Sequence, residues 1–157
     1  MHDDRVLVEA RLRRFVDDHL KPALYRGVAP VTIEAWEAPG EPVTFVEAAA
    51  QRFEPVPVGW RWGRAWSTVW LRVAGDVPAD WVDVPDTRVE LLVDFGYNRS
   101  RSGFQAEGFA YRLDGTPIKS IAPMNSWLPV VESRLDVFIE AAANPDVAGD
   151  YTFDPTP

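Results

Sequence analysis

The residues best suited to bind a ligand lie in one tryptophan-rich segment, residues 59–70. Four of the seven tryptophans fall there, interleaved with two arginines. The flat face of an indole can stack on the C–H face of a sugar ring, and arginine can donate hydrogen bonds to hydroxyl groups. The segment could therefore form a sugar platform. Its candidate residues are Trp60, Trp62, Arg64, Trp66 and Trp70.

The same five residues have a second interpretation, which is packing. Tryptophan supplies a large apolar area to a core, or to an interface with a neighbouring domain. We favour packing over sugar binding, because apolar aromatic clusters more often fill space than hold a ligand. A large tryptophan patch left exposed on the surface would indicate the interdomain version of this interpretation.

The chain offers little for catalysis or for metal binding. It has no cysteine, and its two histidines, His2 and His19, have no serine at a spacing typical of a catalytic triad. The only cluster of metal-ligand types is His2, Asp3 and Asp4. We therefore predict no catalytic residue, no metal ligand and no cofactor in this chain.

Glycoside hydrolysis needs two carboxylates facing each other across a cleft, a separation that spacing alone does not reveal. Four carboxylates fall within expected strands, and we predict that they line a solvated sheet face: Glu90, Asp94, Glu107 and Glu140. Residues 96–103 are predicted to be a solvent-exposed hairpin connection. Residues 98–100 match the glycosylation pattern, but without a secretory signal we expect no modification.

Composition and charge exclude several classes of partner. The 157 residues are 46% apolar, which suits one domain with a core of its own. A net charge of −8 and only two lysines disfavour nucleic acid and anionic membranes, which attract clustered basic residues. No stretch approaches the roughly 20 apolar residues of a membrane span. The absence of cysteine and the acidic, interrupted N-terminus predict a cytoplasmic protein.

The first element expected is an amphipathic helix over residues 4–25. Its apolar residues recur at spacings of three and four: Val8, Leu12, Phe15, Val16, Leu20 and Ala23. Asp3 or Asp4 is expected to cap its start. Pro22 is expected to end or kink it, and Gly27 marks the exit.

Beyond Pro30 the apolar period changes to two, which is typical of half-buried strands. Strands are expected at residues 31–36, 67–73, 88–95, 104–112, 117–121 and 134–142. Asp114-Gly115 predicts a tight hairpin turn between the fourth and fifth of these. Residues 43–53 are ambiguous, because three alanines favour helix while the preceding β-branched residues favour strand. Closely spaced strands without intervening helices predict an all-β, antiparallel β-sandwich behind the N-terminal helix.

Four segments of the chain resemble the N-terminal region of glycoside hydrolase family 38 α-mannosidases of the cytoplasmic bacterial and fungal type. They read WGRAWSTVWL over 62–71, VELLVDFG over 89–96, GFQAEGFAYRLDGTPI over 103–118 and IEAAANP over 139–145. The order of the segments and the preceding helix match as well. The chain departs from this pattern near Ser120, where the family favours glycine.

The resemblance implies a jelly-roll or galactose-binding-like sandwich placed ahead of a catalytic domain. It implies that the parent enzyme hydrolyses terminal α-mannosides with retention, using an aspartate and zinc or another divalent cation. In the family a His-x-Asp motif of the following domain supplies metal ligands, and no such motif occurs here in that context. The isolated chain is therefore expected to be inactive.

Three hypotheses for the function follow. The leading one is a non-catalytic module that packs on the catalytic domain of the same polypeptide and contributes to a homo-oligomer of the full enzyme. The second is an ancillary carbohydrate-binding module that holds a mannoside on residues 60–70. The third is an independent enzyme. The expected organisation is a helix and connection at 1–29, the sandwich at 30–143, and a linker at 144–157 toward a catalytic domain.

Overall fold

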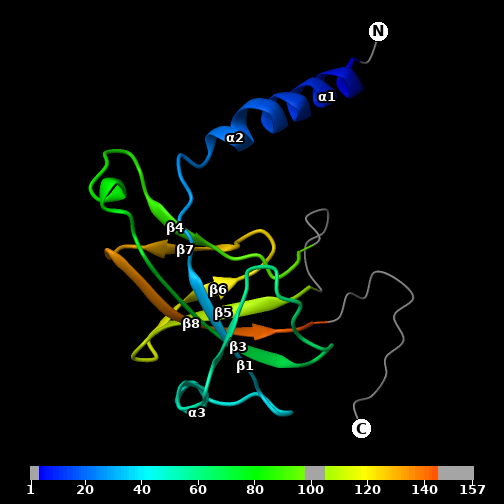
Figure 1. The fold of residues 1–157 in the computed structure, drawn as a ribbon. Helices are drawn as coiled ribbons and strands as arrows, with labels where there is room; N and C mark the ends of the chain where they lie inside the picture. The colour runs from blue at the N-terminus through cyan, green and yellow to red at the C-terminus, as the bar shows by residue number, and fades with distance from the viewer. Residues whose placement is uncertain (1–3, 98–104, 145–157) are drawn as a thin grey trace. The chain divides into compact units, whose positions relative to one another are not determined.

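The computed structural model describes residues 4–97 and 105–144. The chain divides into two compact units, Met1–Pro30 and Val31–Pro157, each described here by itself (Figure 1). The first unit contains the N-terminal helix and a connecting segment, and the second contains all the described strands. The predicted fold class, an all-β sandwich with an N-terminal helix, is confirmed.

The N-terminal helix is continuous, but its hydrogen-bonding pattern changes from α to π and back to α. It consists of α1 (Arg5–Phe15), a π-helical turn η1 (Val16–Leu20) and a last turn α2 (Lys21–Ala23). The wide turn directly precedes Pro22, whose ring would collide with the carbonyl four residues earlier in a regular helix. The helix ends one residue after Pro22, at Ala23. Asp4 occupies the N-cap position, but its side chain makes no capping hydrogen bond; Asp3 lies outside the described residues.

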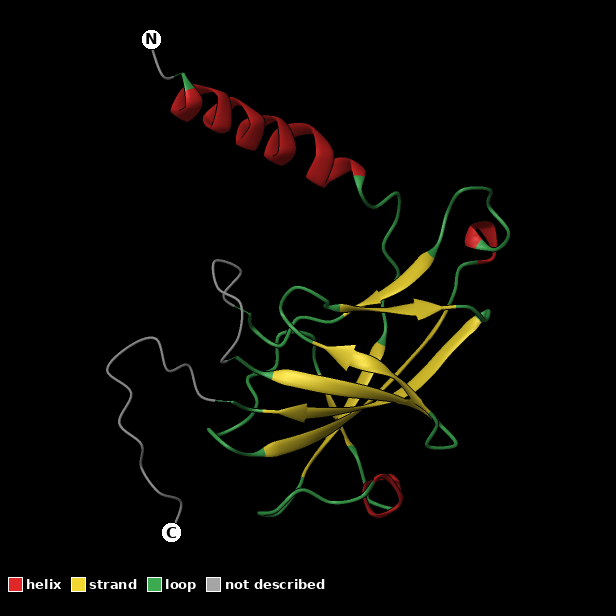
Figure 2. Ribbon diagram, turned by 180° about the vertical axis from the view of Figure 1, so that it is seen from behind, coloured by secondary structure: helices red, strands yellow, loops and turns green. Residues whose placement is uncertain are grey.

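In the described part of the second unit, eight strands form two antiparallel sheets (Figure 2). The larger sheet has the order β2-β1-β3-β8-β5-β6, and the smaller pairs β4 with β7. The strands are β1 (Thr32–Glu37), β2 (Glu54–Val56), β3 (Thr68–Asp76), β4 (Val89–Leu92), β5 (Glu107–Arg112), β6 (Pro117–Ile121), β7 (Trp127–Val130) and β8 (Arg134–Ala142). Two short helices interrupt them, α3 (Phe45–Ala49) and the 3₁₀ turn η2 (Ala79–Trp81).

The main core lies between the two sheets. Leu91 of β4 and Leu128 of β7 pack against inward-facing side chains of the larger sheet. Those side chains are Val73, Ala110, Ile121, Leu135, Val137 and Ile139. Alternate residues along a strand face opposite sides of a sheet, so the apolar alternation of residues 134–142 predicted this inner face correctly.

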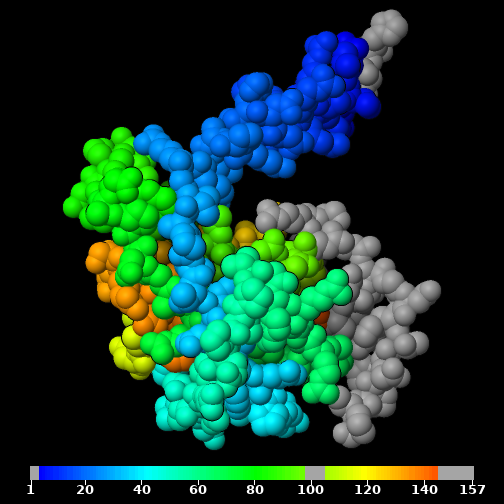
Figure 3. All heavy atoms as spheres, viewed as in Figure 1, coloured from blue at the N-terminus to red at the C-terminus, as the bar shows by residue number. Residues whose placement is uncertain are grey.

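The outer face of the larger sheet carries a second, aromatic cluster. Trp70 and Phe138 are buried there together with Ala48, and Phe45, Phe53 and Tyr111 pack around them. Ala48 and Phe45 come from α3, which covers this face. The segment from β1 through α3 and β2, cyan to teal, forms much of the near side of the sandwich in Figure 3. The central strands are thus covered on both faces.

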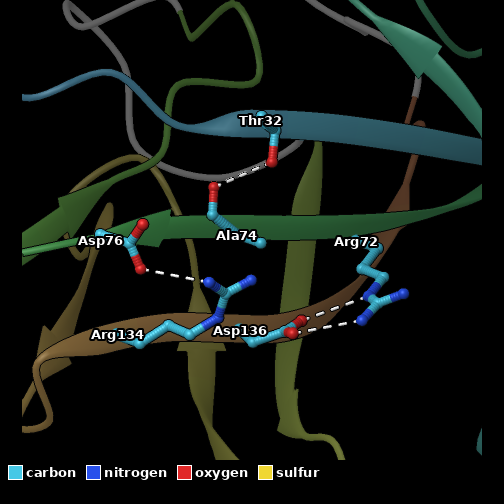
Figure 4. A network of polar contacts seen from close by, with 6 residues as sticks. All are labelled: Thr32, Arg72, Ala74, Asp76, Arg134 and Asp136. Atoms are coloured by element: carbon cyan, nitrogen blue, oxygen red, sulfur yellow. Dashed lines mark hydrogen bonds and ion pairs between the residues drawn. The ribbon is translucent and has the colours of Figure 1, made fainter.

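Side-chain pairs tie the central strands together at one end of the larger sheet (Figure 4). Arg72 of β3 donates two hydrogen bonds to the carboxylate of Asp136 on β8, at 3.2 and 3.1 Å. Arg134 reaches Asp76 at 3.1 Å, and the Thr32 hydroxyl donates to the Ala74 carbonyl at 3.0 Å. These contacts link β1, β3 and β8 in addition to their backbone pairing.

Candidate functional site

The tryptophan-rich segment forms the loop that leads into β3. The loop is attached to the C-terminal end of β8 by backbone hydrogen bonds. The N–H of Trp66 donates to the Ala143 carbonyl at 2.8 Å, and the N–H of Ala143 donates to the Ser67 carbonyl at 2.9 Å. Gly63 packs on the same residue, since a Cβ at this position would lie 2.7 Å from that of Ala143. The loop therefore lies beside the last described residues after β8.

The five candidate residues do not share one environment. Trp60 and Trp62 are half-buried, whereas Arg64 and Trp66 are exposed. Trp62 meets Phe95 edge-on, with ring centroids 5.4 Å apart, and Phe95 in turn contacts Tyr97 at 5.8 Å. The Arg64 guanidinium lies 3.6 Å from the Glu37 carboxylate. Both side chains are exposed, so this ion pair contributes little to stability.

Trp70 corrects the sequence interpretation. Its side chain is 0% exposed, because it belongs to the outer-face cluster and stacks on Tyr111 with centroids 5.6 Å apart. Its indole N–H has no hydrogen-bond partner in the described part of the chain. Trp70 therefore packs a core and contributes to neither a sugar platform nor an interdomain surface.

Trp66 is the exposed anchor of the segment. Trp66 is 52% exposed. Its backbone φ of 69° lies in the left-handed region, which residues other than glycine rarely adopt. Trp62 packs edge-on against Phe95, and Trp70 is buried. These two rings therefore do not form a row of exposed parallel faces with Trp66. Trp66 is therefore the exposed tryptophan among the five candidate residues, and the exposed Arg64 lies two residues before it.

The candidate carboxylates support the local structure. Asp94 accepts hydrogen bonds from the N–H groups of Gly96 and Tyr97 at 2.9 and 3.0 Å, which closes a turn. Glu140 accepts a hydrogen bond from the Tyr111 hydroxyl at 3.2 Å. No arrangement of two carboxylates across a cleft emerges from these contacts.

The tyrosines near these carboxylates are poor acid–base groups at neutral pH. Burial raises the pKa of Tyr97 far above its usual range, and the charges of Asp94 and Glu107 raise it further. Burial and then the charge of Glu140 raise the pKa of Tyr111 as well. Both phenols therefore remain protonated at neutral pH.

The described residues contain no group of three or more metal-ligand side chains that could hold an ion. His2 and most of the loop at 96–103 lie outside the described residues. No helix within 4–97 and 105–144 is long and apolar enough to cross a membrane.

A shallow groove of ≈ 470 Å³ lies near the start of β8, away from the tryptophan-rich loop. Ile118, Val130 and Leu135 are among its lining residues, together with Arg112 and Glu132, whose charged atoms lie 3.7 Å apart. The other charged lining residues are Asp114, Arg134 and Asp136, of which Arg134 pairs with Asp76 and Asp136 pairs with Arg72.

Sequence reasoning identified the tryptophan-rich loop but missed the residues that position it. Ala143 and Phe95 hold the loop from elements far along the chain. A contact between residues 63 and 143 leaves no trace in local spacing or periodicity, so no pattern in the sequence could have found it.

Residues 29–156 match a family model described as "Alpha-mannosidase, jelly roll domain". No curated protein matches the chain.

Proposed function

The chain belongs to the family of α-mannosidase jelly roll domains, and we propose that it serves as a non-catalytic module packed against the catalytic domain of such an enzyme. In this role the sandwich contributes contact area and stability. Hydrolysis of terminal α-mannosides, the zinc or other divalent cation, and the residues that bind it all belong to the partner domain. The cytoplasm is the proposed compartment, because disulfides are rare there and the chain contains no cysteine.

The observation that carries this proposal is the exposed Trp66 on the loop that precedes β3 and lies beside the end of β8. A large aromatic side chain that is half exposed on a constrained loop is typical of an interface anchor. Left-handed backbone at a tryptophan costs of order 1–3 kcal/mol, and such strain is commonly found where it has a role. Because the loop is bonded to Ala143, a domain that follows β8 would lie within its reach.

The contacts of the described residues agree with a non-catalytic role. Asp94 closes a turn and Glu140 accepts from Tyr111, so neither is arranged as an acid or a nucleophile. Mannoside binding on residues 60–70 has less support, since Trp70 is buried and Trp62 packs edge-on against Phe95.

The test is made on Trp66 in the α-mannosidase that contains this module. We expect Trp66→Ser to lower the unfolding midpoint of the whole enzyme by several degrees, because an interface anchor is lost. In the 157-residue chain the same change should cost little, since the residue is half exposed. Thermal unfolding of both proteins measures the difference.

Arg52→Ser, at an exposed position outside the loop, is the control and should have no effect in either protein. An equal loss of stability in enzyme and isolated chain would contradict the packing role. A change in tryptophan fluorescence when the chain is titrated with methyl α-mannoside would instead favour the carbohydrate-binding hypothesis.

A further inference from the structure

The N-terminal helix exposes a long apolar face. Large apolar side chains follow one another along it at spacings of three to five residues, and each is about half exposed or more. They are Val8, Leu12, Phe15, Leu20 and Leu24, of which Leu12 is 64% and Leu24 67% exposed. An amphipathic helix gains most of its stability by burying such a face, so a face of this extent is typical of an interaction surface.

The π-helical turn keeps this face aligned. In a regular helix, residues four apart drift around the axis, because one turn holds 3.6 residues. Leu20 and Leu24 would then move away from Val8 and Leu12. The turn at Val16–Leu20 closes with hydrogen bonds five residues apart and so takes up an extra residue. This brings the later leucines back toward the face of the earlier residues.

Beside the apolar face, charges alternate in sign every four residues. The order is Arg5, Glu9, Arg13, Asp17 and Lys21. Residues four apart are neighbours on a helix surface: the Arg5 guanidinium lies 2.7 Å from the Glu9 carboxylate, and the Lys21 ammonium lies 2.6 Å from the Asp17 carboxylate. Read in reverse, the last four of these residues, from Glu9 to Lys21, give the opposite sign at each place. These four residues are therefore complementary to an antiparallel copy of themselves.

We propose that this helix binds a second copy of itself in antiparallel orientation, with the two helices crossing near Phe15. In this arrangement Glu9 faces the partner's Lys21, and Arg13 faces the partner's Asp17. The apolar face, centred between Leu12 and Leu20, meets its counterpart. A parallel pair in register would bring like charges together, so the charge order selects the antiparallel pairing.

The size of the helix sets the strength of this association. From α1 to α2 it is about 28 Å long, so one helix pair buries less than the roughly 1,600 Å² of a standard stable interface. The isolated chain is expected to self-associate weakly and in a concentration-dependent way. The proposal does not depend on packing against a catalytic domain.

Sedimentation velocity of the 157-residue chain over a concentration series tests this proposal. We expect a monomer–dimer equilibrium that Leu12→Asp weakens about tenfold or more, because a charge replaces a leucine that the dimer would bury. Ala10→Asp is the matched control. It adds the same charge two residues away, on the opposite side of the helix, and should leave the equilibrium unchanged.

Charge exchange tests the orientation. Arg13→Glu and Asp17→Lys should each weaken self-association, whereas an equimolar mixture of the two variants should restore dimers, since each new charge then faces its opposite. A mere loss of helix stability would not be repaired by mixing. The proposal is overturned if the wild-type chain stays monomeric at several hundred micromolar, if Leu12→Asp and Ala10→Asp behave alike, or if mixing restores nothing.

Discussion

At the scale of single residues, Gly63 determines how the tryptophan-rich loop meets β8. Its φ of 72° is in the left-handed region, and an added Cβ would lie 2.7 Å from the Cβ of Ala143. Gly63→Ala therefore combines backbone strain with a collision. We expect it to lower the free energy of unfolding by about 2–4 kcal/mol, measured by urea unfolding of the 157-residue chain.

Gly40 provides the control for this prediction. It also has a positive φ, of 91°, but an added Cβ there would meet nothing within 4 Å. Gly40→Ala should therefore show the backbone cost alone, about 1–2 kcal/mol. Equal losses in the two variants would show that the contact with Ala143 contributes nothing to stability.

At the scale of elements, α3 depends on its first turn. The N–H of Glu47 donates to the Thr44 hydroxyl at 3.3 Å, and the N–H of Thr44 donates to the Glu47 carboxylate at 2.9 Å, which completes a capping box. We expect Thr44→Ala to cost about 1 kcal/mol at pH 7. Ser133→Ala, an exposed position in the turn before β8, is the control and should cost nothing.

The cost of Thr44→Ala should also depend on pH. Hydrogen bonds from the Thr44 side chain and then its backbone lower the pKa of Glu47 below the usual 4.5. A carboxyl whose pKa is lower in the folded state stabilises the fold above its unfolded pKa, and this contribution is lost as the pH falls through the folded value. The difference between wild type and Thr44→Ala should thus shrink below pH 4.5. A constant difference would contradict the role of the carboxylate.

The elements also show what a sequence can predict. Alternation located β8 correctly because one of its faces is apolar over nine residues. Trp70 is one of the candidates for a sugar or interdomain surface in the sequence, but α3, which forms within the ambiguous residues 43–53, packs over it. The short strands β2 and β7 were missed. Each contains a proline, Pro55 and Pro129, a residue that argues against a strand unless the strand lies at a sheet edge.

At the scale of the whole molecule, the two units are expected to fold separately. Neither core cluster contains a described residue from Met1–Pro30, and the family match begins at residue 29. We predict that a chain of residues 29–157 keeps its unfolding midpoint within about 2 °C of the 157-residue chain at low micromolar concentration. Its circular dichroism should lose most of the helical signal.

The unfolding midpoint distinguishes a helix that packs on its own sandwich from one that binds a second copy of the chain. A fall in the midpoint of more than about 5 °C would mean that the helix packs on its own sandwich, since such a shift corresponds to roughly 1–2 kcal/mol in a domain of this size. If the helix binds a second copy, the chain of residues 29–157 should keep its midpoint at low concentration. It should also lose self-association at high concentration. The sandwich would then supply the contact with the catalytic domain, and the helix the contact between molecules.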